Sequence, residues 1–305
     1  MTTHTPTAQP RTRPDLSPPR RRVGPTTATV LRYAALTVVA LAFLYPLWWA
    51  LSNSIKPPQQ IITDSLGFDP RAATLVNYRS MLESVPLGTG FRNTAIVVGI
   101  KGAITLFFCP LAGFAFAKYH FPGKRALFGT VLLTLMLPVL VLIIPLLLEM
   151  SNLSWINTYQ ALILPGSIDA FSIFWMRQTI QSVPDELLDA ARIDGATEFG
   201  LYWRVVLPVI RPGIAALAVL TFMNIYNDFV WPVVAVNDTS KETLQVVLST
   251  LSQGLSGGKA TGLDFTQVWG QLLAASSLAM LPVLIVFVVL QRHFINGLMA
   301  GSVKG

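Results

Sequence analysis

Long apolar stretches separated by short polar segments dominate this chain. Six stretches reach the length of a membrane-spanning helix, at about residues 31–51, 93–117, 126–148, 156–176, 212–236 and 268–290. Crossing a hydrocarbon core of about 30 Å takes roughly 20 helical residues. Because backbone groups in lipid must be hydrogen-bonded by the protein itself, we predict an all-α, polytopic bundle of six transmembrane helices.

The composition agrees with this pattern. Hydrophobic residues make up 52% of the 305 residues, and charged residues make up only 12%. A soluble domain carries about 25% charged residues, roughly twice this fraction. The net charge of +7 would favour nucleic acid as the partner of a soluble chain, but here the basic residues flank apolar spans. We therefore predict a lipid bilayer, and no nucleic acid, as the surroundings of this chain.

Lysine and arginine also predict the orientation of the spans. Most of them lie in the N-terminal tail, after the second and fourth spans, and at the C-terminal end. This bias puts both termini in the cytoplasm. Residues 1–27 are rich in Pro, Thr and Arg and are predicted to be a disordered tail, which leaves residues 28–305 as the transmembrane domain. The arginines at 20–22 precede a span-length run with no cleavage site, which argues against a cleaved export signal.

The residues that usually carry chemistry are sparse. The single cysteine, Cys109, lies in an apolar segment, and His4, His120 and His293 are scattered outside the spans. No cluster has the spacing of a metal site, and no nucleophile lies beside a base. We predict no catalytic residue, no metal and no cofactor bound to this chain.

The cytoplasmic loop 178–211 has its own helical pattern. Pro184 followed by two acidic residues is typical of a helix start, because proline suits the first turn and acids favour the positive end of the dipole. Gly195 interrupts this helix, and a second short helix runs through Trp203 to Leu207-Pro208. The helical pattern alone fits two interpretations. The loop is either an amphipathic connector on the lipid headgroups or a docking element for a soluble partner.

The residues of this loop resemble a known family. The segment DELLDAARIDGATEFGLYWRVVLPVIRPG is similar to the EAA loop in permease subunits of binding-protein-dependent ABC importers. Asp189 stands where the family has Glu, and Val205 where it has Ile, while the spacing from Gly195 to Leu207-Pro208 matches. FPGKR at 121–125 and the ending GLMAGSVKG at 297–305 resemble maltose-type sugar permeases.

This resemblance implies an energy-coupled sugar or oligosaccharide importer of the bacterial inner membrane, in which the loop docks on an ATPase. It also implies a second, different permease chain, two ATPase subunits that hold ATP and Mg, and an external sugar-binding protein that contacts the outer loop 237–267. The matching coupling residues are Asp189, Ala190, Ala191, Asp194, Gly195, Leu207 and Pro208, and the tail residues Ser302, Val303, Lys304 and Gly305 match those that reach the ATPases.

Charged residues inside the spans form a further candidate site. Lys101 and Asp228 each lie 8 residues from the outer end of their span, so both are about 12 Å deep. They could be an ion pair that clamps the bundle. Alternatively, Asp228 lines a substrate path with Asn224, Asn227 and Trp231, because sugars present hydroxyls to polar groups and an apolar face to aromatic rings. Both interpretations stay open, and Asp169 lies deeper, about 20 Å in.

A stand-alone secondary transporter is the competing class of function. Such transporters often contain two repeated halves with interrupted helices. This chain shows no convincing internal repeat, and six spans are few. Proton-coupled uptake by the purified chain alone would support this alternative.

Overall fold

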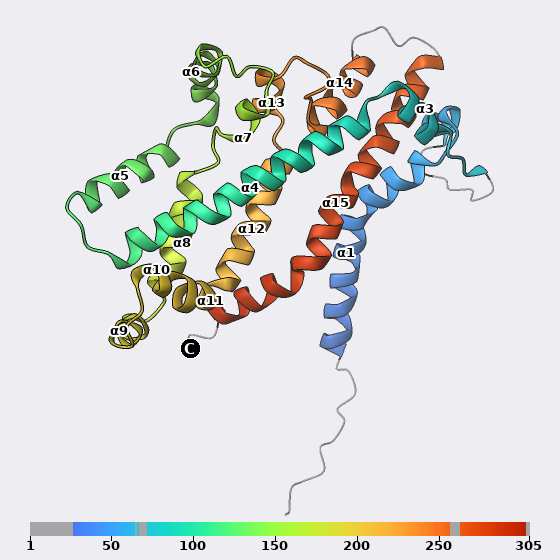
Figure 1. Cartoon of the computed structure of the whole chain (residues 1–305). Coiled ribbons are helices and arrows are strands. Elements are labelled where there is room, and N and C mark those ends of the chain that lie inside the picture. Colours follow the sequence, from blue (N-terminus) through green and yellow to red (C-terminus); the bar gives the residue numbers. More distant parts are fainter. Residues whose placement is uncertain (1–26, 65, 67–71, 257–262, 303–305) are drawn as a thin grey trace, which may run out of the picture. The chain divides into compact units, whose positions relative to one another are not determined.

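The computed structural model describes residues 27–64, 66, 72–256 and 263–302, and every element in these ranges is a helix (Figure 1). The chain divides into two units between Trp48 and Trp49. The first unit contains most of α1 (Thr27–Ser54), and the second contains all later elements. The predicted disordered tail 1–27 lies outside the described residues, apart from Thr27 at the start of α1.

Helix α1 has the properties of a lipid-facing span. It is 28 residues long, and its most apolar stretch of 18 residues contains no buried residue. Large side chains such as Phe43 (79% exposed) and Leu31 (71% exposed) project outward. Such continuous apolar exposure would be unfavourable in water, so α1 fits the first predicted span.

The second unit is a bundle built around α4 (Leu87–Lys118), which packs along α8, α12 and α14, while α15 packs along α12, α14 and α3. In Figure 1, α9, α10 and α11 lie at one end of this bundle, and α3, α7, α13 and α14 lie at the other. The other helices are α2 (Pro58–Thr63), α3 (Val76–Ser84), α5 (Lys124–Leu135), α6 (Val139–Asn152), α7 (Tyr159–Ile163), α8 (Ala170–Gln181), α9 (Asp185–Ile193), α10 (Glu198–Gly200), a π-helical segment (Leu201–Val206), α11 (Leu207–Val209), α12 (Arg211–Tyr226), α13 (Val230–Ala235), α14 (Leu244–Ser256) and α15 (Leu263–Ser302).

Three of the six predicted spans are not continuous helices, and to that extent the prediction was wrong. Segment 126–148 is divided into α5 and α6, which are bent by 103° at residues 136–138, where Pro138 lacks a backbone N–H. Segment 156–176 is interrupted between α7 and α8, where Gly166 has a φ of 69°. Segment 212–236 is interrupted at residues 227–229, between α12 and α13.

The count of candidate spans changes accordingly. Within the described residues, three helices are long and apolar enough to cross a membrane: α1, α4 and residues Phe265–Val289 of α15. Two bent pairs raise this number to five. One is α5 with α6, and the other is residues Glu198–Val209 with α12, bent by 80°.

Segment 237–256, which the sequence places in a loop, contains a helix, α14. Its Leu244 and Val247 are buried against the N-terminal end of α4. The amide of Asn93 donates hydrogen bonds to the carbonyls of Ser240 and Glu242, at 3.0 and 2.8 Å. This segment is therefore fixed to the bundle, and residues 257–262 lie outside the described residues.

Close packing of α4 on α8 depends on Gly113. A Cβ at this position would lie 2.8 Å from the backbone nitrogen of Arg177 and 2.8 Å from Cβ of Met176. We expect Gly113→Ala to lower the free energy of unfolding by about 1–3 kcal/mol, the usual cost of overpacking. The melting temperature of the purified protein in detergent measures this change. Gly99→Ala is the matched control, because Gly99 is on the same helix with no atom within 4 Å of an added Cβ; equal effects of both variants would contradict the prediction.

Candidate coupling hairpin and intramembrane pocket

The loop 178–211 folds as the helix–glycine–helix hairpin that its sequence predicts. Helix α9 begins directly after Pro184, with Asp185 and Glu186 in its first turn. Gly195 then has a φ of 83°, and the N–H of Ala196 donates to the carbonyl of Ala191 at 2.9 Å. This left-handed residue after the helix is a common helix end, and it turns the chain into α10. We call residues 185–209 the coupling hairpin.

Apolar side chains on its inner face hold the coupling hairpin against the bundle. Leu188 is 1% exposed, and Leu201 and Val206 are completely buried. They form one core cluster with Phe114 of α4 and Leu217 of α12. Leu201 and Val206 are the first and last residues of the π-helical segment. This rare conformation occurs frequently at functional sites.

Three large apolar side chains of the coupling hairpin are exposed rather than packed in the core. Ile193 is 87% exposed, Phe199 is 66% exposed and Leu187 is 46% exposed. Leu187 is therefore exposed although its neighbour Leu188 is buried. Because these three exposed side chains belong to one short segment, they make the coupling hairpin a candidate interaction surface.

The sequence-predicted coupling residues are divided between these two faces. Ala191 and Leu207 are partly buried against the core cluster. Asp189, Ala190, Asp194, Gly195 and Pro208 are exposed. Of the predicted tail contacts, Ser302 is the last residue of α15, and Val303, Lys304 and Gly305 lie outside the described residues.

Lys118, the last residue of α4, joins this helix to the start of α9. Its ammonium donates to the carbonyl of Val183 and to Oδ1 of Asp185, both at 2.6 Å. The Lys118 side chain is 7% exposed, whereas that of Asp185 is 76% exposed. The hydrogen bond from Lys118 holds the pKa of Asp185 below its ordinary value, so this contact is charged at neutral pH.

Tyr119 joins the same end of α4 to the second half of the hairpin. Its hydroxyl donates to Oε2 of Glu198. Arg192 connects Glu198 (3.2 Å) to Asp189 (3.0 Å). Burial and the contact with Glu198 raise the pKa of Tyr119 to about 12, so the hydroxyl stays protonated and able to donate. We call Lys118 and Tyr119, with their partners Asp185 and Glu198, the α4 latch.

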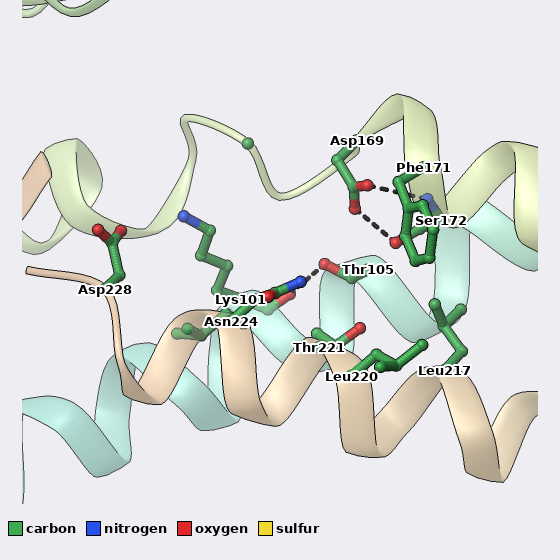
Figure 2. Close-up of a pocket in the computed structure, with 12 residues that line it drawn as sticks. Lys101, Thr105, Asp169, Phe171, Ser172, Leu217, Leu220, Thr221, Asn224 and Asp228 are labelled. Atoms are coloured by element: carbon green, nitrogen blue, oxygen red, sulfur yellow. Dashed lines mark hydrogen bonds between the residues drawn. The ribbon is translucent and has the colours of Figure 1, made fainter. Parts of the chain in front are cut away.

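A polar pocket lies in the bundle between α4, α8 and α12 (Figure 2). Its volume is about 240 Å³. Lys101 reaches it from α4, Asp169 from the residue before α8, and Asp228 from the break after α12. The lining comprises Lys101, Thr105, Gly166, Asp169, Phe171, Ser172, Leu217, Leu220, Thr221, Asn224, Ile225 and Asp228.

The structure brings Lys101 and Asp228 to this pocket without a direct ion pair. The ion pairs formed among the described residues are those of Lys118 with Asp185 and of Arg192 with Asp189 and Glu198. Oδ1 of Asp228 instead accepts from the backbone N–H of Trp231 at 3.4 Å. The Lys101 ammonium lies beside Gly166, where an added Cβ would be 3.7 Å away. The predicted clamp is therefore not a closed contact in this structure.

Two of the predicted substrate-path residues lie outside the pocket lining. Asn227 donates its amide to the carbonyl of Met223 at 2.9 Å. Trp231 is 8% exposed, and its indole N–H donates to the carbonyl of Ala161 at 2.7 Å. Asp169, which had no assigned role, caps α8 by accepting from the backbone N–H of Ser172 at 2.8 Å.

Comparison with known protein families identifies the larger group. The family model described as "Binding-protein-dependent transport system inner membrane component" matches residues 110–299, which include the whole coupling hairpin. The chain belongs to this family. It is thus a multi-pass component of the bacterial inner membrane, with a transport role rather than a catalytic one, in a family without bound cofactors.

Individual relatives match over nearly their whole length. The chain is 34% identical to the arabinooligosaccharides transport system permease protein AraQ of Halalkalibacterium halodurans, over 88% of this chain and 93% of that protein. It is 31% identical to the lactose transport system permease protein LacG of Rhizobium radiobacter (90% and 96%) and to the sn-glycerol-3-phosphate transport system permease protein UgpE of Salmonella typhi (88% and 95%).

The fold agrees with a solved transporter. A chain from the crystal structure of a bacterial ABC transporter involved in the import of the acidic polysaccharide alginate superposes with a TM-score of 0.74 at 24% identity, over 87% of this chain and 95% of that one. At this identity the likeness shows the fold alone: an all-helical membrane permease.

Proposed function

We propose that this chain is a permease subunit of an ATP-driven ABC importer that carries a sugar or oligosaccharide delivered by an external binding protein. The coupling hairpin carries this proposal, because it exposes Leu187, Ile193 and Phe199 while the α4 latch ties it to a membrane-spanning helix. The names of AraQ and LacG support a sugar as the cargo. The maltose-type ending and loop spacing support a sugar-importer subgroup.

The proposed assembly contains a second, different permease chain, two ATPase subunits with ATP and Mg, and the binding protein. Both termini are proposed to lie in the cytoplasm, as the distribution of basic residues predicts. Six crossings are reached if α5 with α6, α7 with α8, and α12 with α13 each count as one interrupted crossing. Non-helical backbone at membrane depth is tolerated where it is covered by protein or lines a cavity, and the pocket meets that condition for two of these interruptions.

The proposed mechanism transmits a displacement from the ATPases to the pocket. Closure of the ATPases on ATP moves the coupling hairpin. Its exposed residues Asp189, Ala190 and Gly195 are small or charged, which suits close contact with the ATPase. The α4 latch passes this movement to α4. Lys101 lies 17 residues from Lys118 along that helix, which corresponds to about 25 Å at the rise of an α-helix. The hairpin and the pocket thus contact the same helix, α4, at two positions along its length.

The energy source tests the proposed function. We expect liposomes containing the chain with its companion permease and ATPases to accumulate sugar only when ATP and the binding protein are both present. A proton gradient without ATP should give no uptake, because this chain is assigned no ion-coupled step. Radiolabelled sugar in the liposome lumen measures the result. ATP-independent uptake by the purified chain alone would instead establish a secondary transporter.

A further inference from the structure

Two interruptions of helical structure meet at the intramembrane pocket. The break at residues 164–169 contributes Gly166 and Asp169, and the break at residues 227–229 contributes Asp228. In the membrane interior, irregular backbone is found where protein covers it or where it lines a water-filled cavity. The two breaks therefore lie where irregular backbone is tolerated, and both line a cavity that a polar ligand could enter.

The pocket contains hydrogen-bonding groups that no protein partner uses. Lys101 and Asn224 make no side-chain hydrogen bond or ion pair with a described residue. Asp169 accepts from the backbone N–H and the hydroxyl of Ser172, and Asp228 accepts from the backbone N–H of Trp231. A carboxylate can accept further bonds beside these. Figure 2 shows the Lys101 side chain extended on the side of the pocket where Asp228 lies, and a Cβ added at Gly166 would lie 3.7 Å from its ammonium. Donors and acceptors thus face one small space.

The formal charge of the pocket disfavours an anionic ligand. One ammonium, of Lys101, stands against two carboxylates, of Asp169 and Asp228, so the formal charge is −1. Like charges repel strongly where few water molecules screen them. A uronic acid or a phosphate would add a second uncompensated negative charge, whereas an uncharged hydroxyl can both donate and accept.

The remaining lining suits a sugar ring. Phe171, Leu220 and Ile225 form an apolar wall beside the polar groups. An apolar wall with a few placed polar groups is the usual composition of small-molecule sites. The volume of about 240 Å³ is below the usual range of about 300–1,000 Å³. The space therefore fits one sugar residue rather than a whole oligosaccharide.

We propose that this pocket is a selectivity site that binds one residue of an uncharged sugar and rejects sugar acids and sugar phosphates. Lys101 and Asn224 donate to the sugar hydroxyls, and Asp169 and Asp228 accept from them. The proposal rests on the proposed function, because it assumes that sugar passes through this permease. It distinguishes this chain within a family whose members are named for neutral as well as phosphorylated cargo.

Protection from alkylation tests the pocket directly. In the full complex in nanodiscs, Leu220→Cys places a thiol in the pocket wall, and the native Cys109 is fully buried. We expect lactose or arabinotriose to slow the reaction with N-ethylmaleimide. At about ten times its Kd, a sugar should slow it about tenfold, because only the empty pocket reacts. Glycerol 3-phosphate and an alginate trisaccharide should give no protection, but they should gain it when Asp169→Asn and Asp228→Asn are added.

Matched variants separate binding from general damage. Asn224→Ala should abolish protection by the neutral sugars. Asn227→Ala should retain it, because Asn227 is also at the C-terminal end of α12 but does not line the pocket. Protection by the anions in the parent complex, or no protection by either neutral sugar, would overturn the proposal. ATP hydrolysis stimulated by the binding protein is measured in parallel. If stimulation is present without protection, the pocket assignment alone fails; if stimulation is absent, the proposed function fails.

Discussion

Gly195→Asp in the coupling hairpin is expected to abolish ATP-driven uptake while the protein remains in the membrane at its normal level. Gly195 is exposed, with a φ of 83° and no atom within 4 Å of an added Cβ. Aspartate is among the residues that enter this conformation at modest cost, so the fold should survive. The new carboxylate would be buried against the ATPase, and an unpaired buried charge costs about 3–5 kcal/mol. The affinity for the ATPase should therefore fall about a hundredfold or more.

Gly123→Asp supplies the matched control for this result. Gly123 lies in another loop, between α4 and α5, and it has a φ of 80° with no atom within 4 Å of an added Cβ. The backbone strain and the added charge are thus the same in both variants. Uptake of labelled sugar, the amount of protein in the membrane and co-purification of the ATPase are measured for each. If Gly195→Asp transports normally, or if both variants fail equally, the docking assignment is wrong.

Removal of the α4 latch is expected to uncouple ATP hydrolysis from transport. The double variant Lys118→Met with Tyr119→Phe keeps the size of both side chains and removes their hydrogen bonds to Asp185 and Glu198. The core cluster should still hold the coupling hairpin in place, so the ATPases should still bind. Uptake per ATP hydrolysed should fall about tenfold, within the range of about 5- to 150-fold that is typical of coupling between sites.

Two further variants distinguish a coupling role of the α4 latch from a purely structural one. Lys124→Met is the control. Lys124 is the first residue of α5, and its ammonium donates to the carbonyl of Tyr119 at 2.7 Å instead of to a residue of the hairpin. The variant should leave the uptake-to-ATP ratio unchanged. The exchange Lys118→Asp with Asp185→Lys should restore part of the coupling lost in Lys118→Asp alone. Normal coupling in the double variant, or no rescue by the exchange, would show that the latch has only a structural role.

The sequence predicts the hairpin well because its signals are local. Pro184 with two acidic residues determines where α9 begins, and Gly195 supplies the only positive φ that the turn needs. The helix interruptions are harder to predict, because apolar composition alone does not distinguish one span from two pieces. Pro138 and Gly166 were visible in the sequence, but prolines and glycines are tolerated in many continuous membrane helices.

The α4 latch and the pocket could not be predicted because both depend on contacts between distant segments. Lys118 reads as an ordinary basic residue at the cytoplasmic end of a span, and its partner Asp185 lies 67 residues further along the chain. Equal depth suggested a pairing of Lys101 with Asp228, and both residues line the pocket without forming an ion pair. It could not reveal that the turn at Gly166 lies beside the Lys101 ammonium, or that Asp169 joins the same pocket.

The interruption between α7 and α8 has a consequence for how the chain is made. α7 has 5 residues and α8 has 12, so neither reaches the roughly 20 residues that a segment needs to leave the insertion machinery for lipid unaided. Both pack against α4, which is synthesised before them. Biogenesis of this segment would therefore be a cooperative step, in which the earlier helix acts as an intramolecular chaperone for the later one.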